Sequence, residues 1–234
     1  PTKKDFNIWA PEIIEKDGKY YLYYSISTFG SRVSCIGLAT CTNLKKPKWV
    51  DEGLVINSNN FTPYNAIDPS IVKADDNWYM AFVSWSEGID IVELDSNTMK
   101  PVHDVKPQKI ATRNMAANAI EGCCIWNPGN GWYYLFASYD KCCAGINSTY
   151  NIRYGRGKSV TGPYIDEDGK EMLLGGGTVV LSSYNNKIGP GGQSIFKTDD
   201  GYALAFHYYD KNFNGRSTLS ILDLKLGSDG WLEF

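Results

Sequence analysis

The sequence predicts an all-β protein built as a β-propeller, and three observations support this prediction. An extended apolar stretch, a short acidic or glycine-rich turn and an aromatic strand recur four times along the 234 residues. The first aromatic residue after each turn is Tyr20, Trp78, Trp132 or Tyr202, so the repeats lie 58, 54 and 70 residues apart. No long stretch has helical periodicity, and a repeat of this length in a strand-rich chain is typical of propeller blades.

The first half of each repeat predicts a β-hairpin. Its four copies cover residues 9–25, 68–84, 121–138 and 192–208, and in each one apolar residues alternate with polar ones or gather in short runs. Acidic residues, Asn or Gly stand between the two runs, as the turns of hairpins require. Aromatic residues are frequent in the second run of each copy, which suits packing between neighbouring strands.

The second half of each repeat predicts another hairpin. It covers residues 34–53, 89–101, 150–169 and 217–231, which contain a strand of small and β-branched residues followed by a connector and a turn. Two hairpins make a four-stranded antiparallel blade, whereas a β-sandwich would not explain four matched segments at this spacing. Four copies fit a four-bladed propeller, and they also fit a five-bladed one that lacks its first blade.

The composition limits the number of domains and the kinds of partner. No linker rich in Pro and Ser separates the repeats, so residues 1–234 are expected to form one domain. Aromatic residues make up 14% of the chain, which excludes disorder and suits a sugar-binding surface. The net charge of −3, with scattered Lys and Arg, gives no footprint for nucleic acid or an anionic membrane. There is no run of 18 apolar residues, so no membrane span is expected.

The cysteines favour an oxidising compartment. Two adjacent pairs lack the spacer of a zinc site, and an even number favours disulfides, so we expect at least one bridge. Adjacent residues have Cα atoms only about 3.8 Å apart, below the usual disulfide range, and buried free thiols are the alternative. The opening PTKKDFN has no signal-peptide pattern, which suits a mature or trimmed product. The cysteines are Cys35, Cys41, Cys123, Cys124, Cys142 and Cys143.

Two carboxylates occupy matching places in two repeats. Asp68 ends the segment Asn-Ala-Ile-Asp, and Glu121 ends the segment Asn-Ala-Ile-Glu. Equivalent positions of different blades converge on a propeller axis, and two carboxylates at a cleft are the minimum equipment of a glycosidase. Small apolar neighbours would raise the pKa of Glu121, which suits a general acid. Alternatively, both acids cap turns at blade ends. Asn65, which begins the first segment, is a candidate for substrate binding.

Other residues near the same blade positions are weaker candidates. Glu12 is expected to be exposed or bonded to a turn. Gly192 takes the acid's place in the fourth repeat, where it contributes only backbone and space, and Gln193 can offer an amide to a sugar hydroxyl. His207 follows the last aromatic strand, so it lines the axis or packs within the sheet.

Four aromatic residues at strand ends are candidates for stacking on the apolar faces of sugars. They are Trp9, Phe29, Tyr139 and Trp85, and each would stand near the top of a blade. Packing in the core or at its rim is the alternative for each ring.

At these motifs the sequence resembles the endo-1,5-α-L-arabinanases of glycoside hydrolase family 43, especially the extracellular fungal type. The matching segments span nearly the whole chain in the expected order. They are WAPE (9–12), YYSISTFGS (23–31), IGLAT (36–40), NAIDPS (65–70), IEG (120–122), YYLFASYDKCCAG (133–145), STYNIRYGR (148–156), VTGPY (160–164), GPGGQS (189–194) and HYYD (207–210).

The resemblance implies a five-bladed propeller and an inverting mechanism on the α-1,5-linked arabinofuranose backbone of pectin side chains. Glu121 matches the family's general acid, and Asp68 matches the aspartate that tunes the pKa of that acid and orients the substrate. Trp9 and Phe29 match ring positions of the substrate cleft. The family's general base is an aspartate of a His-Asp-Pro motif on the first blade, which by family spacing would lie before Pro1.

The resemblance also sets expectations about ligands and location. No cofactor is required, and a structural calcium ion near the propeller axis is left open; relatives hold a metal with a histidine where this chain has Gly192. We expect a secreted monomer that binds arabinan or arabino-oligosaccharides. Two alternatives are an exo-acting arabinofuranosidase or β-xylosidase of the same family, and a non-catalytic carbohydrate-binding propeller, because no base motif is found in the chain.

Overall fold

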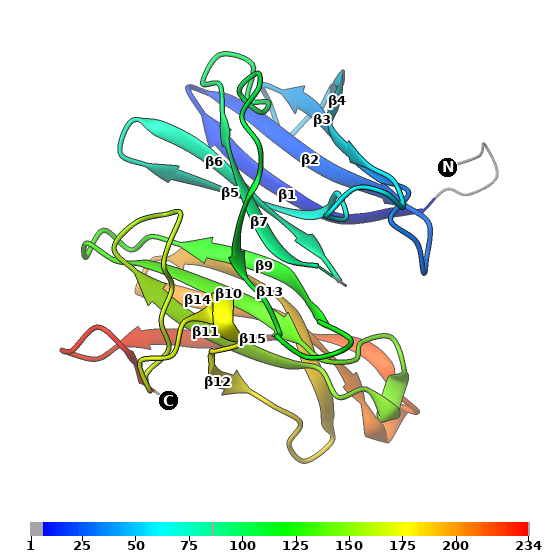
Figure 1. The fold of residues 1–234 in the computed structure, drawn as a ribbon, viewed down its shortest axis with the longest axis vertical. Coiled ribbons are helices and arrows are strands. Elements are labelled where there is room, and N and C mark those ends of the chain that lie inside the picture. Colours follow the sequence, from blue (N-terminus) through cyan, green and yellow to red (C-terminus); the bar gives the residue numbers. More distant parts are fainter. Residues whose placement is uncertain (1–6, 86, 234) are drawn as a thin grey trace. The chain divides into compact units, whose positions relative to one another are not determined.

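Four antiparallel sheets of four strands each make up the protein, as seen in a computed structural model that describes residues 7–85 and 87–233 (Figure 1). Strand neighbours in each sheet follow chain order, so every sheet is a simple meander of the propeller-blade type. The prediction of two hairpins per repeat is therefore confirmed. The opening residues, on which the expectation of a trimmed product rests, lie outside the described residues for the most part.

The strands have the following bounds. The first sheet contains β1 (Ile8–Lys16), β2 (Lys19–Ser27), β3 (Ser34–Cys41) and β4 (Val50–Ser58), and the second contains β5 (Ile67–Ala74), β6 (Asn77–Ser84), β7 (Gly88–Leu94) and β8 (Gln108–Ala111). The third contains β9 (Ile120–Trp126), β10 (Tyr133–Tyr139), β11 (Asn151–Gly157) and β12 (Thr178–Leu181). The fourth contains β13 (Lys187–Thr198), β14 (Gly201–Asp210), β15 (Arg216–Leu226) and β16 (Leu232–Glu233). Three short 3-10 helices, η1 (Gly145–Asn147), η2 (Met172–Leu174) and η3 (Lys211–Phe213), lie in connections.

The chain divides into two compact units, Pro1–Lys109 and Ile110–Phe234. The first two sheets belong to the first unit, apart from the end of β8, and the last two sheets belong to the second. Tight turns shape the hairpins. Asp17 and Gly18 both have positive φ, 53° and 74°, as the two-residue turn between β1 and β2 requires.

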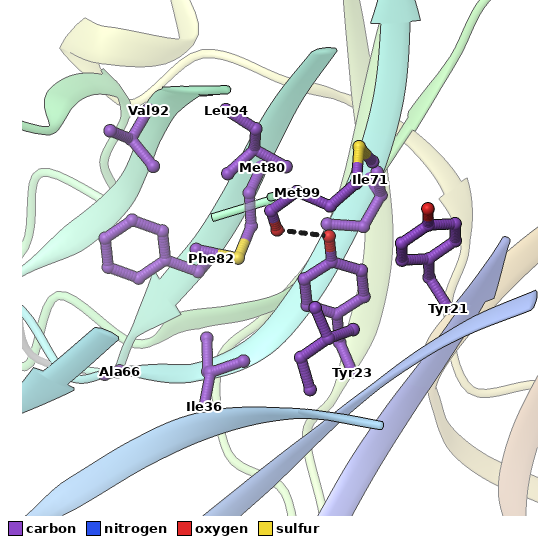
Figure 2. Packing of buried hydrophobic residues seen from close by; sticks show 11 residues of the cluster. Tyr21, Tyr23, Ile36, Ala66, Ile71, Met80, Phe82, Val92, Leu94 and Met99 are labelled. Atoms are coloured by element: carbon purple, nitrogen blue, oxygen red, sulfur yellow. Dashed lines mark hydrogen bonds between the residues drawn. The ribbon is translucent and has the colours of Figure 1, made fainter. Parts of the chain in front are cut away.

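In the first unit, apolar faces of two sheets pack against each other, and β5 lies against β1, β2 and β3. Buried and half-buried residues alternate along β2, whereas β3, β5 and β7 are buried along most of their length. The hydroxyl of Tyr23 donates a hydrogen bond to the Met99 carbonyl at 2.7 Å, which satisfies the one polar atom of a fully buried ring (Figure 2). Each fully buried large side chain contributes about 1.5–3 kcal/mol to stability. The buried members of this core in the first unit are Tyr21, Tyr23, Ile36, Leu38, Ala66, Ile71, Met80, Phe82, Val92, Leu94 and Met99.

The second unit repeats this arrangement, with β13 lying against β9, β10 and β11. Its core is richer in aromatic rings: Phe136 stacks on Tyr154 with ring centroids 5.4 Å apart. Trp126 meets Tyr202 of the neighbouring sheet edge-on at 4.9 Å. Such ring pairs contribute about 0.5–1.5 kcal/mol beyond the area they bury.

Every sheet begins with a strand that carries a β-bulge at the same place. The register shifts lie between Trp9 and Glu12, between Ile67 and Ser70, opposite Phe136–Ser138, and between Gly191 and Ser194. One residue in each bulge has positive φ: Ala10 (32°), Asp68 (51°), Gly122 (57°) or Gly192 (60°). Asp68, Gly122 and Gly192 thus occupy the same bulge position. Glu121 stands one residue earlier, so the two acids that were expected to occupy matching places are displaced by one residue. A bulge turns side chains out of the regular alternation of a strand, and bulges are frequent next to active sites.

The structure contains a disulfide between adjacent residues, Cys142 and Cys143, whose Cα atoms are 3.8 Å apart. This Cα spacing is below the usual disulfide range, as expected for adjacent residues, and the pair is a bridge of the kind that the even number of cysteines favoured. Cys143 has a φ of 59°, and its N–H donates to the Tyr209 hydroxyl at 2.8 Å, so the turn is fastened to β14. Within residues 7–85 and 87–233, no helix is long and apolar enough to span a membrane.

Candidate active site

The candidate general acid, Glu121, lies at the start of β9 in the second unit. It is half-buried, stands opposite Ser138 of β10 and precedes the bulge residue Gly122. The hydroxyl of Tyr150 donates a hydrogen bond to Glu121 Oε1. The bulge therefore places the carboxyl group of Glu121 against Tyr150, which directly precedes β11.

Glycines of the GPGGQS motif make room for this tyrosine. The Tyr150 ring is buried, and a Cβ at Gly191 would overlap it. A Cβ at Gly192 would lie 2.8 Å from His207 Nδ1. The φ of Gly192 is 60°, which glycine adopts without strain. The prediction that Gly192 contributes space is confirmed, and Gly191 does the same for Tyr150.

His207 lies next to Tyr150 in the second unit. Its ring centroid is 6.1 Å from that of Tyr150 and 5.5 Å from that of Tyr209. Burial lowers the pKa of His207 below its usual 6.5, so the imidazole is neutral near pH 7. It is half-buried, and its role in substrate binding stays a prediction.

Gln193 joins the two sheets of the second unit. Its Oε1 accepts from Ser138 Oγ at 2.8 Å, and its Nε2 donates to the Gly122 carbonyl. Ser138 Oγ in turn accepts from the Gly192 N–H at 2.9 Å. Gln193 is buried, so the expectation that it offers its amide to a sugar needs correction: the amide holds the two bulges together.

Asp68 lies in the first unit, at the bulge of β5, and is half-buried. Its N–H donates to Ser25 Oγ at 3.0 Å, and Ser25 is fully buried. Ser25 stands opposite Trp9 in the β1–β2 pairing. Trp9 meets Phe29 edge-on, with ring centroids 6.5 Å apart, and Phe29 is 79% exposed. Three predicted site residues, Asp68, Trp9 and Phe29, thus lie beside the β1–β2 pair, and Trp9 and Phe29 supply aromatic surface.

Asn65 needs a second correction. Its side chain is buried, and its Oδ1 accepts from Ser34 Oγ at 2.6 Å, while Ser34 Oγ also lies 2.7 Å from Ser27 Oγ. The Asn65 carbonyl accepts from the Ile67 N–H at 3.0 Å, one residue before Asp68. Asn65 therefore supports the backbone that leads to Asp68, rather than presenting its amide on a surface.

Glu12 is neither exposed nor bonded to a turn, contrary to the prediction. It is half-buried, and its Oε1 lies 3.5 Å from the Ile71 N–H of β5. Burial raises the pKa of Glu12 from 4.5 to about 7, and the Ile71 N–H acts in the opposite direction. Glu12 directly follows the bulge in β1, and its carboxyl group lies against the backbone of β5 rather than at a turn.

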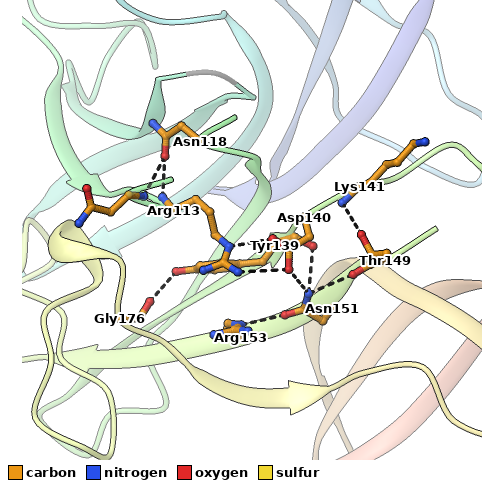
Figure 3. A network of polar contacts seen from close by, with 10 residues as sticks. Arg113, Asn118, Tyr139, Asp140, Lys141, Thr149, Asn151, Arg153 and Gly176 are labelled. Carbon is orange, nitrogen blue, oxygen red and sulfur yellow. Dashed lines mark hydrogen bonds and ion pairs between the residues drawn. The ribbon is translucent and has the colours of Figure 1, made fainter. Parts of the chain in front are cut away.

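Tyr139 was predicted to bind substrate, but its side chain is fully buried. Its hydroxyl donates to the Gly176 carbonyl at 2.9 Å, and the guanidinium groups of Arg113 and Arg153 lie 5.5 and 5.3 Å from its ring centroid (Figure 3). Burial raises the pKa of the Tyr139 hydroxyl further above its ordinary value. Tyr139 is thus a structural residue of the second unit.

A polar network surrounds that ring (Figure 3). Asp140 accepts from Arg113 Nε at 2.8 Å and from Asn151 Nδ2 at 2.8 Å, and Asn151 Oδ1 accepts from Arg153 Nε at 2.8 Å. Burial works to raise the pKa of Asp140, but the hydrogen bonds from Arg113 and Asn151 hold it below its usual 3.8. The network fixes both ends of the connection from β10 to β11, and Tyr150 stands at the end of that connection.

Among the described residues, no group of three or more His, Cys, Asp or Glu side chains could hold a metal ion. The calcium ion near the axis stays a prediction, and no chemical step is assigned to it.

Tyr150 and Ser138 are the site residues that sequence reasoning missed. Both belong to segments that carried the family resemblance, STYNIRYGR and YYLFASYDKCCAG. Nothing in those segments indicated their partners, because Tyr150 meets a carboxylate 29 residues away and Ser138 meets an amide 55 residues away.

The bulged blades and the carboxylate held by a tyrosine place the protein in the class of β-propeller glycoside hydrolases. The sequence matches Glycosyl hydrolases family 43 over residues 1–232, and the chain belongs to that family. It is 49% identical over 229 residues to the extracellular endo-α-(1→5)-L-arabinanase 1 of Bacillus subtilis, covering 97% of this chain and 69% of that protein.

Solved structures agree with this assignment. The GH43 endo-arabinanase of Bacillus licheniformis superposes with a TM-score of 0.91 at 44% identity, covering 97% of this chain and 77% of that one. A Cellvibrio cellulosa α-L-arabinanase, solved in complex with arabinohexaose, gives 0.89 at 34% identity, covering 97% of this chain and 76% of that one. The propeller fold predicted from the repeats is confirmed, with four blades in this chain; the fifth blade stays a prediction.

Proposed function

We propose that this protein is an endo-acting glycoside hydrolase that cleaves internal α-1,5-L-arabinofuranosidic linkages of arabinan with inversion of configuration. Membership of family 43 and the identity to an endo-arabinanase support the reaction class and the substrate. The observation within the molecule that carries the proposal is the matched pair of bulges, which bear Asp68 and, one residue earlier, Glu121.

In this proposal Glu121 is the general acid. It gives its proton to the glycosidic oxygen while the bond from that oxygen to the anomeric carbon breaks. A water molecule attacks the anomeric carbon from the opposite face and loses its proton to a general base. Asp68 tunes the pKa of Glu121 and orients the sugar. The base is assigned to no described residue.

Substrate contacts are assigned to aromatic groups that are not fully buried. Phe29 and Trp9 offer an aromatic surface beside Asp68, and the neutral His207 borders Tyr150. Rings of this kind stack on the C–H faces of sugars. We therefore assign arabinan binding to Trp9, Phe29 and His207, and no longer to Asn65, Tyr139 or Gln193.

Incubation of the protein with linear α-1,5-arabinan, with products resolved by size over time, tests the proposal. Short oligomers should appear before arabinose accumulates. The Glu121→Gln variant should lose at least about 10³-fold in kcat, because a barrier without proton donation is several kcal/mol higher. Glu233→Gln removes a carboxyl group from an exposed position of β16 and serves as the matched control.

Three other outcomes would each reject part of the proposal. Arabinose as the first and main product would select the exo-acting alternative. Saturable binding of arabino-oligosaccharides without products over long incubation would select a carbohydrate-binding propeller. Unchanged turnover in Glu121→Gln would remove Glu121 from the role of acid.

Location, assembly and metal content are further parts of the proposal. Secretion is supported by the similarity to an extracellular enzyme, and culture fractionation with an intact-mass measurement tests it. Light scattering of the purified chain should give a monomer. A structural calcium ion would raise the thermal midpoint on addition of calcium and lower it with a chelator, whereas an unchanged midpoint would reject it.

A further inference from the structure

Tyr150 is held rigidly at the point where it meets Glu121. Its ring is 4% exposed, and it lies against Gly191, where a Cβ would overlap it. A Cβ at Gly189 would lie 3.3 Å from the Tyr150 Cβ. His207 borders the ring on another side. With glycine backbone and an imidazole around it, the ring cannot turn away without displacing β13.

The backbone that leads into Tyr150 is fixed as well. The Thr149 N–H donates to the Lys141 carbonyl at 3.0 Å, and the Lys141 N–H donates to Thr149 Oγ1 at 3.1 Å. Ser148 Oγ accepts from the Ala144 N–H at 3.0 Å. On the other side of Tyr150, Asn151 Nδ2 donates a hydrogen bond to Asp140 Oδ2 at 2.8 Å. The hydroxyl of Tyr150 is thus directed at Glu121 by a closed loop rather than by a flexible one.

We propose that Tyr150 is a positioning residue for the general acid: its hydroxyl holds Oε1 of Glu121, so that the proton to be transferred is carried on Oε2. The inference rests on the proposed role of Glu121. In the transfer, the proton leaves Oε2 for the glycosidic oxygen as the glycosidic bond breaks, and Glu121 becomes a carboxylate. Tyr150 keeps its own proton throughout and donates a stronger hydrogen bond to the carboxylate than to the neutral acid.

This arrangement has two measurable consequences. A donor to the charged form lowers the pKa of a carboxyl group, so the Tyr150 hydroxyl favours the carboxylate form of Glu121. It also stabilises the carboxylate that develops in the transition state, which contributes to kcat rather than to substrate binding. In the second unit, His207 borders Tyr150, Tyr209 borders His207, and Cys123 and Cys124 follow Glu121 along β9.

The Tyr150→Phe variant keeps the ring and removes the hydroxyl. We expect kcat on arabinan to fall by about 10- to 100-fold with little change in KM, which is the range for loss of one charge-assisted hydrogen bond. The alkaline limb of kcat/KM should move to higher pH by about one unit, because the free acid keeps its proton longer.

Tyr154→Phe is the matched control. Tyr154 lies in β11, is fully buried, and donates to a different carboxylate, Glu167 Oε1, at 2.5 Å. We expect Tyr154→Phe to lower stability and to keep the pH profile of the parent protein. Thermal melts of both variants separate loss of folding from loss of function.

Substrates with better leaving groups provide the decisive comparison. A nitrophenyl arabino-oligosaccharide needs little protonation of its leaving oxygen, so the effect of Tyr150→Phe should shrink to a few-fold on it. Titration of the Glu121 carboxyl by carbon-detected NMR gives a readout that needs no turnover, and Tyr150→Phe should raise that pKa by about one unit.

The outcomes distinguish the inference from the proposed function. If Glu121→Gln abolishes turnover while Tyr150→Phe matches Tyr154→Phe in pH profile, leaving-group dependence and the Glu121 titration, the positioning role is wrong and the general acid stands. If Glu121→Gln turns over normally, the proposed function is wrong; an upward pKa shift in Tyr150→Phe would then show a contact without a catalytic purpose.

Discussion

Asp68 of β5 and Gly122 of β9 occupy the same bulge position in two different sheets, with φ angles of 51° and 57°. A non-glycine residue at positive φ is uncommon, and Asp is among the residues that tolerate it best. The second sheet therefore carries a carboxylate where the third has glycine, and the third carries its carboxylate one residue earlier. The same backbone device presents both acids.

Replacement of Asp68 separates charge from conformation. Asp68→Asn keeps a residue that tolerates positive φ, so stability should change little. We expect kcat on arabinan to fall by about 10²-fold or more, because the general acid loses the carboxylate that tunes its pKa, and general acid catalysis contributes about 10²–10⁴-fold. Asp68→Ala should show the same loss of turnover and unfold about 1–2 kcal/mol more easily, because alanine is disfavoured at this φ. Kinetics and urea titrations of both variants check this. Full activity in Asp68→Asn would show that the charge has no role.

Gly191 makes room for Tyr150, so Gly191→Ala should act on both stability and turnover. Its Cβ would overlap the Tyr150 ring, and overpacking of this kind costs about 1–3 kcal/mol. We expect a loss of kcat similar to that of Tyr150→Phe. Gly227→Ala is the control, since a Cβ there would meet the side-chain oxygens of Asp229 and Glu233 at 3.0 Å, at the exposed end of the chain. Equal effects of the two replacements would contradict the role of Gly191.

Glu12 should make the first unit lose stability as pH rises. Its pKa is about 7 in the folded protein and 4.5 ordinarily, so the folded state binds more protons between these values. Unfolding free energy therefore falls as pH rises from about 4.5 to 7. Glu12→Gln should flatten this slope and be more stable than the parent by about 1–2 kcal/mol at pH 8, with little difference near pH 4.

Denaturant titrations at several pH values test the Glu12 prediction. Glu15→Gln is the matched control, because Glu15 lies on the same strand and is exposed. Parallel pH profiles for the parent and Glu12→Gln would show that Glu12 titrates normally.

The Arg113–Asp140 ion pair should stabilise the second unit at neutral pH. Asp140 has a pKa held below 3.8, so its contribution is present above that value and is lost as pH falls through the folded pKa. Asp140→Asn tolerates the φ of 71° and should lower stability at pH 7 by about 1 kcal/mol. A double-mutant cycle with Arg113→Met measures the coupling between the two side chains.

Asp17→Asn is the control for this cycle. Asp17 is also at positive φ and also accepts from a cation, Lys16, at 2.8 Å, but its side chain is 84% exposed. We expect no measurable change in the unfolding free energy of Asp17→Asn. A coupling of zero between Arg113 and Asp140 would mean that the pair merely accompanies the packing around Tyr139.

Much of the fold was predictable because its signals are local. The Asp17-Gly18 turn needs two residues that adopt positive φ, and the alternation around Tyr21 and Tyr23 shows which face of β2 is buried. Such signals repeat in each blade, so their period is visible in the chain. The matched segments before Asp68 and Glu121 identified the bulge region in two blades, whereas the displacement of the two acids by one residue is visible only in the structure.

The wrong predictions share a physical cause. Glu12 was expected at a surface or a turn, but it lies against β5. Asn65 and Gln193 were expected to hydrogen-bond a sugar, but Ser34 and Gly122 take up these groups inside the protein. Tyr139 was expected to stack on a sugar, but its ring is buried beside Arg113 and Arg153. Burial of a polar side chain depends on what other segments bring to it, and a single segment does not contain that information.

The sequence by itself determined the repeated hairpins, the blade class and the two carboxylates, because turn chemistry and strand periodicity act between near neighbours. Only the tertiary structure decided that Tyr150 meets Glu121, that Gly191 makes room for the ring, and that Gln193 joins the two bulges of the second unit. Those contacts join residues between 29 and 71 positions apart. They form only when sheets pack, since packing brings distant backbone within the few ångströms over which hydrogen bonds and close contacts act.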